Sequence, residues 1–507
     1  MTAFRAHTKQ FLLGPRPARI WPDWTIIEMA DGLFLSACPR LRATRLHTRE
    51  GIAYWLLGLA VLADDPGRTI AELFPSKHAS EIEEWTGFWA GRWALVSADG
   101  VWPDASGCLG IHHRIVGGEV WISSSPALLG DHVPGAPSEP YIAWHVLHRT
   151  GIDWIPVPLT TRENVYKLMA LRTIHPVTGD IRPVRFRAAE RDEGANGHAL
   201  ATALKTIMTN WGRIGYRQRY LGLTAGVDTR TVLAAASAAG VVAEACTIAY
   251  PEASRADLVL PPKLAAMAGI PHKLVRKPTP PLPLPEILAR ADAIAEHIDG
   301  ATYHPVSSYF ANGLDDFMHD AGCTMATGHI LDLGRCFYWR RFANAGLGEA
   351  LPTADQVLDA FFTRPTAPLP FWSRHPRARW REAVQIWLDS LATPRALKLD
   401  WRDAFHLDQG SGGWESTVLR AMDVVDGTYF PAGNCIWVLH LLTRYPVEQR
   451  MASFAYTETV RELFPALAKV PINPPGRIAR VKRRARRLLG ERATNVLKSY
   501  LRRLKLR

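Results

Sequence analysis

The sequence is poor in cysteine and has no closely spaced cysteine pair. No C-x-x-C motif occurs in its 507 residues, and the six cysteines stand at Cys38, Cys108, Cys246, Cys323, Cys336 and Cys435. This spacing predicts neither a disulfide framework nor a zinc site and favours reduced, buried thiols. An uninterrupted apolar run of 18 residues is also missing, and the N-terminus shows no secretory apolar region. We therefore expect a cytoplasmic protein.

An excess of positive charge is missing from most of the chain. The net charge is +12, and residues 477–507 hold 13 Lys and Arg but only one acid. Because the rest of the chain carries equal numbers of basic and acidic residues, its composition argues against nucleic-acid binding. Apolar residues recur among the cations of the tail at near-helical spacing. The tail is therefore interpreted as a helix that packs on the body, contacts an anionic membrane surface, or binds an acidic partner.

Two common phosphate-binding motifs are also missing. The sequence contains no G-x-x-x-x-G-K-[ST] element, which argues against a Walker-type site. The strand-to-helix turn at residues 223–229 also has no G-x-G-x-x-G pattern, which argues against a dinucleotide fold.

Hydrophobic patterning divides the chain into four regions. Residues 1–135 show short alternating stretches, which predict antiparallel strands with helical pieces at 51–62 and 79–87. Residues 136–197 are interpreted as a bridging region. In residues 198–476 strands alternate with helices, which predicts an α/β domain with a doubly wound parallel sheet. Residues 477–507 are the basic helical tail. Strands are expected at 91–100, 119–129, up to 223, 243–250 and 323–330, and helices at 199–211, 224–240 and 256–269.

The turn between the strand ending at Leu223 and the next helix carries the chemistry. It is Thr224-Ala225-Gly226-Val227-Asp228-Thr229. Small residues let a phosphate approach the main chain, threonine hydroxyls can donate to phosphate oxygens, and helix N-termini favour anions. A carboxylate beside phosphate calls for a cation between them, and Mg²⁺ takes both kinds of oxygen. The alternative is that Asp228 and Thr229 only cap a helix.

Four segments in order resemble the asparagine synthetase superfamily, including asparagine-synthase-like proteins, lasso-peptide cyclases and β-lactam-forming synthetases. The loop TAGVDT resembles the S-G-G-x-D-S pyrophosphate loop, and CTIAY (246–250) resembles the second strand of that family. MATGHILD (325–332) resembles its G-x-x-x-[DE] segment. The helix after the second strand keeps the family residues Ala256, Asp257, Ala265, Gly269, Ile270, Pro271 and His272.

The resemblance implies a site for ATP and Mg²⁺. It implies that Asp228 and Asp332 hold the metal and act in catalysis together with Arg450, which lies in the less diagnostic segment 440–474. The implied nucleotide-binding residues are Leu223, Thr224, Ala225, Gly226, Asp228, Thr229, Arg230, Thr247, Ile248 and Gly328, with the backbone at Thr247 and Ile248 facing adenine. Tyr338, Glu415 and Lys469 are further candidates by position.

The N-terminal region resembles the glutaminase-type domain of the same family, an N-terminal-nucleophile αββα sandwich. Active members carry a nucleophilic cysteine directly after the initiator methionine, whereas this chain has Thr2. A hydroxyl is a weaker nucleophile than a thiolate, so we expect an inactive domain. The amine for the reaction would then come from elsewhere.

The resemblance thus implies an ATP-dependent, AMP-forming carbon–nitrogen ligase. The enzyme would adenylate the carboxylate of a small-molecule or peptide substrate and form an amide bond, with peptide macrolactam formation in natural-product biosynthesis as one possibility. Three alternatives stay open: a degenerate nucleotide-binding or scaffold protein, an asparagine synthase that uses free ammonia, and a tRNA-modifying enzyme. Ala225, Thr229 and Leu333 depart from the family pattern and favour the degenerate protein.

Overall fold

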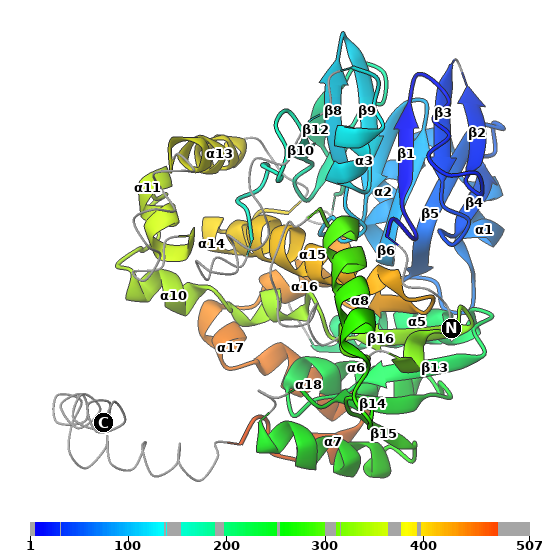
Figure 1. Ribbon diagram of the computed structural model, residues 1–507. Helices are drawn as coiled ribbons and strands as arrows, with labels where there is room; N and C mark the ends of the chain where they lie inside the picture. The colour runs from blue at the N-terminus through cyan, green and yellow to red at the C-terminus, as the bar shows by residue number, and fades with distance from the viewer. Residues whose placement is uncertain are drawn as a thin grey trace.

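The computed structural model describes residues 6–30, 32–135, 138, 154–187, 197–250, 254–299, 311–314, 316–362, 377–392 and 397–474. Within these residues the chain forms two antiparallel sheets and one parallel sheet. Figure 1 shows the antiparallel sheets in blue and cyan at the upper right and strands β13 to β16 of the parallel sheet in green below them. The fold is therefore mixed α/β, as the sequence predicts. Thr2 and the basic tail at 477–507 lie outside the described residues.

The two antiparallel sheets pack face to face. Their strand orders are β10-β8-β9-β1-β3-β2 and β12-β11-β7-β6-β5-β4. Phe11 and Leu35 of the first sheet share a buried cluster with Leu57 and Val96 of the second, which makes the pair a sandwich. The strands are β1 (Phe11–Gly14), β2 (Thr25–Ala30), β3 (Leu33–Ala37), β4 (Ala43–His47), β5 (Ala53–Leu62), β6 (Trp89–Ser97), β7 (Gly100–Pro103), β8 (His112–Val116), β9 (Glu119–Ser123), β10 (Tyr166–Lys167), β11 (Arg172–Ile174) and β12 (Ile181–Pro183).

Short helices lie against both sheets of the sandwich. Helix α3 (Pro126–Asp131) contacts β8 and β9, and α1 (Ile70–Leu73) contacts β5. Helix α2 (Ala79–Trp85) confirms the helix expected near 79–87. Strands β10, β11 and β12 come from the bridging region and extend the two sheets. The sandwich therefore reaches Pro183.

The helix expected at 51–62 is wrong, because Ala53–Leu62 form strand β5. This strand is the continuous apolar run AYWLLGLAVL and lies between β4 and β6. Side chains on both of its faces are buried or half-buried, so the strand lacks the polar alternation that marks a half-exposed one. Periodicity alone does not distinguish such a run from a buried helix.

The second part of the chain is built on a five-stranded parallel sheet of order β15-β14-β13-β16-β17. From β13 the chain passes to β14 and β15 on one side and then to β16 and β17 on the other. The order thus reverses between β13 and β16. The elements are β13 (Gln218–Gly222), β14 (Glu244–Ile248), β15 (His272–Val275), β16 (Cys323–Thr327) and β17 (Thr428–Pro431), with α5 (Gly197–Arg213), α6 (Val227–Ala238), α7 (Arg255–Met267) and α18 (Phe454–Leu463).

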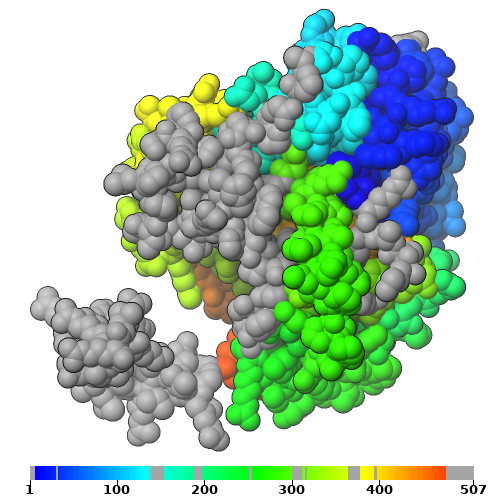
Figure 2. Space-filling view, in the orientation of Figure 1, coloured from blue at the N-terminus to red at the C-terminus, as the bar shows by residue number. Residues whose placement is uncertain are grey.

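A continuous helix crosses the middle of the molecule. It consists of α14 (Trp401–Phe405), a π-helix (His406–Glu415) and α15 (Ser416–Ala421). Helix α8 (Leu284–His297) packs against α15 and lies across the front face in Figure 2. The remaining helices include α10 (Trp339–Asn344), α11 (Ala354–Val357), α13 (Arg377–Ser390), α16 (Ile436–Thr443), α17 (Val447–Met451) and α19 (Pro465–Ala468).

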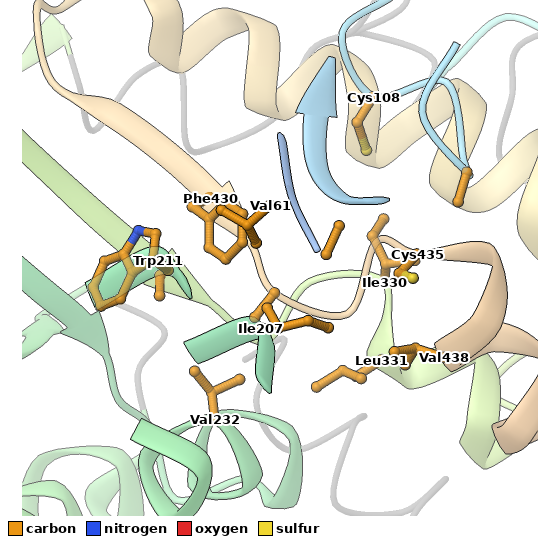
Figure 3. Close-up of a cluster of buried hydrophobic side chains, with 14 of the residues drawn as sticks. Val61, Cys108, Ile207, Trp211, Val232, Ile330, Leu331, Phe430, Cys435 and Val438 are labelled. Carbon is orange, nitrogen blue, oxygen red and sulfur yellow. The ribbon is translucent and has the colours of Figure 1, made fainter. Parts of the chain in front are cut away.

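One hydrophobic core runs from the sandwich into the parallel-sheet part. Figure 3 shows Val61 of β5 close to Phe430 of β17, with Trp211 of α5 and Val232 of α6 in the same cluster. Buried polar contacts join the same two parts, because Arg92 on β6 donates to both carboxylate oxygens of Asp423 at 2.9 and 2.7 Å. Breaking such a pair leaves a buried charge, so the two parts are held in one arrangement.

The six cysteines are free and buried, as the sequence predicts. Among the described residues, no helix has the length and apolar character needed to cross a membrane.

Candidate functional site

Two loops meet where the strand order of the parallel sheet reverses. Residues 223–226 follow β13, and residues 328–335 follow the neighbouring strand β16. There is no room for a side chain at Gly328 beside the backbone of Asp228, so the second loop lies against the first turn of α6. In open parallel sheets, ligands bind at the carboxyl ends of the strands at such a point. The structure therefore brings together the two segments on which the nucleotide-site hypothesis mainly depends.

The loop after β13 turns into α6 through hydrogen bonds between its own residues. The N–H of Thr224 donates to Thr229 Oγ1 at 3.1 Å, and the two threonine hydroxyl oxygens are also 3.1 Å apart. The N–H of Gly226 donates to Thr224 Oγ1 at 3.1 Å. Thr224 is exposed, and Asp228 lies in the first turn of α6. Both hydroxyls therefore lie beside a helix N-terminus, where backbone N–H groups favour an anion.

Ala225 fits the loop without backbone strain. Its backbone is not left-handed, so the position does not require glycine. Its side chain is fully buried, and its N–H donates to Asp257 Oδ1 on α7 at 3.0 Å. The residue therefore ties the loop to α7, and its N–H already donates to a protein carboxylate rather than to a ligand.

Gly328 lies at a close approach between the second loop and the first turn of α6. A Cβ atom added there would lie 2.9 Å from the carbonyl carbon of Asp228 and 2.9 Å from the nitrogen of Thr229. Both are backbone atoms, which cannot swing away as a flexible side chain can. Glycine at this position thus keeps the end of β16 against the first turn of α6.

Asp228 is paired with a cation from the second loop. Arg335 Nη1 donates to Asp228 Oδ2 at 2.9 Å. Burial raises the pKa of Asp228 to about 7, although Arg335 opposes the rise and Asp332 adds to it. A carboxylate with this pKa binds a proton or a cation readily near neutral pH.

Asp332 interacts with two groups from the central helix. His406 Nε2 lies 3.3 Å from Asp332 Oδ2. Burial opposes ionisation of Asp332, but His406, Arg335 and His329 outweigh it and lower its pKa. Glu415 is buried nearby, and burial followed by repulsion from Asp332 raises its pKa well above the usual value.

The backbone between Gly328 and Asp332 is strained. Ile330 has a φ of 74°, a left-handed value that β-branched residues rarely adopt. Its N–H points to Glu415 Oε1 at 3.4 Å. Strain of this kind costs of the order of 1–3 kcal/mol and is concentrated at functional sites. Such a turn sets the direction in which Asp332 leaves the end of β16.

Two carboxylate oxygens where these segments meet could bind a ligand. Asp228 Oδ1 and Asp332 Oδ1 are buried and have no hydrogen-bond partner among the described residues. Carboxylate oxygens suit Mg²⁺, which commonly keeps one or two protein carboxylates and takes its other ligands from phosphate and water. In the described part of the chain, no group of three or more His, Cys, Asp or Glu could hold a metal ion by itself. The residues present therefore fit a magnesium ion shared with a phosphate rather than a closed protein metal site.

The other predicted nucleotide-binding residues have different surroundings. Leu223 is buried, and its carbonyl accepts from Thr247 Oγ1 at 2.7 Å, which joins the ends of β13 and β14. Ile248 is the last residue of β14 and pairs with Val275. Arg230 is buried, and its guanidinium donates to the carbonyl groups of Val470 and Pro471. In this structure Arg230 holds the C-terminal segment against α6.

Arg450 is also committed to protein groups. Its Nη1 and Nη2 donate to the two carboxylate oxygens of Asp403 at 2.7 and 2.8 Å, and Nη2 donates to the carbonyl of Leu333 at 2.9 Å. Only 3% of its side chain is exposed. The arginine expected to act in catalysis therefore fixes the residue next to Asp332.

Sequence reasoning missed three contributors to this site. Neither Arg335 nor His406 is among the candidates from the sequence, and Glu415 is a candidate by position alone. His406 and Glu415 lie more than 70 residues after Asp332 in the chain, within a helix whose π segment has no recognisable sequence pattern. A π segment inside a helix is itself associated with functional sites, but here only the structure reveals it.

The chain was compared with known proteins. No protein-family model matches it, and no curated protein does.

Proposed function

We propose that the protein is an ATP- and Mg²⁺-dependent ligase that adenylates a carboxylate and forms an amide bond. One observation carries the proposal. A loop with two threonine hydroxyls at a helix N-terminus meets two aspartates, each with one unpartnered buried oxygen, at the reversal point of a parallel sheet. Such a site suits the triphosphate of a nucleotide.

Each residue of the proposed site has a separate role. The hydroxyls of Thr224 and Thr229 and the first turn of α6 would hold phosphate oxygens. Asp228 and Asp332 would hold Mg²⁺, which neutralises the charge on the phosphates when bound. Gly328 allows the loop that carries Asp332 to lie against the first turn of α6, which carries Asp228. Alignment and charge neutralisation are the main demands of such a reaction.

The acceptor amine would come from the substrate or from free ammonia. Cys38 and Cys108 lie inside the chain and cannot combine a thiol with a free α-amino group. Burial raises the pKa of the Cys108 thiol, which makes it a poor nucleophile. The sandwich then serves the ligase as a packing partner rather than as a source of ammonia.

A second candidate is a scaffold protein without ligase activity. Two observations favour it: the N–H of Ala225 is bonded to Asp257, and Arg335 occupies one oxygen of Asp228. In this alternative the loop is locked by its own partners and does not bind a nucleotide.

Calorimetric titration with ATP and Mg²⁺ separates the two, because it needs no knowledge of the acid substrate. We expect one saturable site that is lost in Asp228→Asn and in Asp332→Asn. Asp320→Asn is the matched control, since Asp320 is an exposed aspartate at the opposite end of β16. Failure of the unchanged protein to bind Mg-ATP would favour the scaffold. ATP–pyrophosphate exchange with candidate acids then tests the chemistry.

A further inference from the structure

A small pocket lies between the sandwich and the central helix, separate from the nucleotide site. His112 of β8 and Lys167 of β10 line it on the sandwich side. Gly413, Thr417 and Arg420 line it on the side of the helix that runs below the sandwich in Figure 1. It therefore occupies the junction between the two parts of the chain.

Three basic side chains line this pocket, and the part of the chain that the structure describes places no acidic side chain among them. Arg420, Lys167 and His112 are 2%, 5% and 2% exposed, and no carboxylate of the described residues lines the pocket. The acids that raise the pKa of Lys167 or Arg420 are Asp104, Asp299 and Asp423, and each is already engaged; Asp299 accepts from the guanidinium of Arg162. Asp423 binds Arg92 through both oxygens, and Asp104 accepts from the backbone N–H groups of Cys108 and Leu109.

The nitrogen atoms of the pocket are only partly satisfied. Lys167 Nζ donates to the carbonyl of Gly412 and to Ser416 Oγ, and Arg420 Nη1 donates to the carbonyl of Ser124 at 3.1 Å. Other nitrogens are buried and have no hydrogen-bond partner among the described residues; they are Arg420 Nε, His112 Nδ1 and Trp154 Nε1. Leaving such a group unpaired costs about 1–3 kcal/mol, and more for a charged one.

The pKa values of two basic groups in the pocket are lowered. Burial lowers the pKa of Lys167 well below its usual value, and the charge of Arg420 lowers it further. Burial, together with Arg92, also lowers the pKa of Arg420 to about 10. Burial is the largest cause of both shifts, and a neighbouring positive charge adds to each.

The size of the pocket limits its occupant. About 20 Å³ is open to the centre of a water molecule. A space of about 10–15 Å³ on this measure is the minimum for one water. The pocket therefore admits a group of a few heavy atoms and excludes a nucleotide or an aromatic ring.

We propose that this pocket binds a small monovalent anion, such as chloride or a one-carbon carboxylate, between Arg420, Lys167 and the indole of Trp154. The anion neutralises the like charges where the sandwich meets the helix that carries His406 and Glu415. It thereby stabilises the junction between the two parts. Anion binding in this pocket does not require ligase activity.

Titration of the full-length protein with sodium formate, in a chloride-free buffer of constant ionic strength, tests the proposal. We expect one saturable site by calorimetry, a Tm that rises with formate concentration, and competition by chloride. Benzoate should not bind because its ring exceeds the pocket. Absence of saturable formate binding, or equally tight binding of benzoate, would overturn the proposal.

Variants assign the binding to this pocket. Arg420→Met should weaken formate binding at least tenfold. Gly413→Ala keeps every charge but places a Cβ 3.1 Å from Trp154 Cδ1, so it should also weaken binding at least tenfold even if Arg420→Met fails to fold. Arg45→Met is the matched control, because Arg45 is exposed on β4. Unchanged affinity in Gly413→Ala would place the anion elsewhere and refute the assignment.

Discussion

Arg335 and Asp228 form an ion pair, with 2.9 Å between Nη1 and Oδ2, that joins the segment after β16 to the first turn of α6. The two side chains are 23% and 19% exposed, so solvent screens the pair only in part. Arg335 therefore stabilises the ionised form of the Asp228 carboxyl group near neutral pH.

Arg335→Gln should lower the free energy of unfolding by about 1–3 kcal/mol at pH 8. Without the guanidinium the pKa of Asp228 rises above its present value of about 7. At pH 6 the carboxyl group is then protonated and the loss is smaller. Urea unfolding at the two pH values measures the difference. Arg217→Gln, which breaks an exposed pair with Asp320, should cost less than about 1 kcal/mol. Equal losses at both pH values for Arg335→Gln would contradict this account.

Gly328→Ala should destabilise the protein by about 1–3 kcal/mol and abolish Mg-ATP binding, because the new methyl group pushes the end of β16 away from α6. Gly222→Ala serves as the control, since its Cβ would first meet Met325 Sδ at an ordinary 3.5 Å. Thermal unfolding and calorimetric titration check both variants. Normal nucleotide binding by Gly328→Ala would show that close contact between the loops is not needed.

Ala225→Gly should not raise activity, although it brings the loop closer to the S-G-G-x-D-S sequence that TAGVDT resembles. The backbone at Ala225 is not left-handed and its methyl group is buried, so glycine would remove packing and add flexibility to the unfolded chain. We expect a loss of about 1 kcal/mol in unfolding free energy. ATP–pyrophosphate exchange should not increase. A marked increase would mean that the β-carbon obstructs phosphate after all.

Arg450→Met should destabilise the protein by about 3 kcal/mol or more, because Asp403 would remain buried without its cation. Adding Asp403→Asn should recover part of the loss, since an uncharged amide oxygen can still accept from Trp339 Nε1. Urea unfolding of the two single variants and the double variant gives the coupling energy. Additive losses would show that the pair contributes no stability. Full stability together with lost exchange activity would instead support a role of Arg450 in the reaction.

His297→Phe should make the protein less sensitive to acid. Burial lowers the pKa of His297 from 6.5 to about 3, although Asp423 opposes the shift; His7, Arg420 and Lys9 add to it. Between these pH values the unfolded chain binds one more proton, so the unchanged protein loses about 1.4 kcal/mol per pH unit as the pH falls. Unfolding at pH 4, 5 and 6 should show a slope smaller by that amount in the variant. An equal slope in the variant and the unchanged protein would show that His297 is not the group responsible.

The sequence predicts the parallel sheet from local patterns, whereas the meeting of its two loops is implied only by the family resemblance. Strands β13, β14 and β16 are bounded by clear turns, and the glycine and acid after β16 have a fixed spacing. Strands β15 and β17 were missed, since each has only four residues and lies close to helical segments. Pairing across the sheet decides their structure, and pairing is not visible in a short stretch of sequence.

The surroundings of the site residues were less predictable. Nothing in the sequence shows that Arg450 pairs with Asp403 or that Arg230 reaches the carbonyl of Pro471, because these contacts join segments far apart in the chain. The left-handed turn at Ile330 is also invisible, since a β-branched residue is the wrong type for it. Tertiary packing decides all three features.

The π winding of residues 406–415 has an angular consequence. In an α-helix of about 3.6 residues per turn, two residues nine positions apart lie on opposite sides. Bonding from i to i+5 widens the turn to about 4.4 residues, which returns the ninth residue to nearly the same side. His406 and Glu415 begin and end this segment, and they contact Asp332 and the N–H of Ile330. Deleting one residue between them to restore α winding would therefore rotate one of the two away from the aspartates.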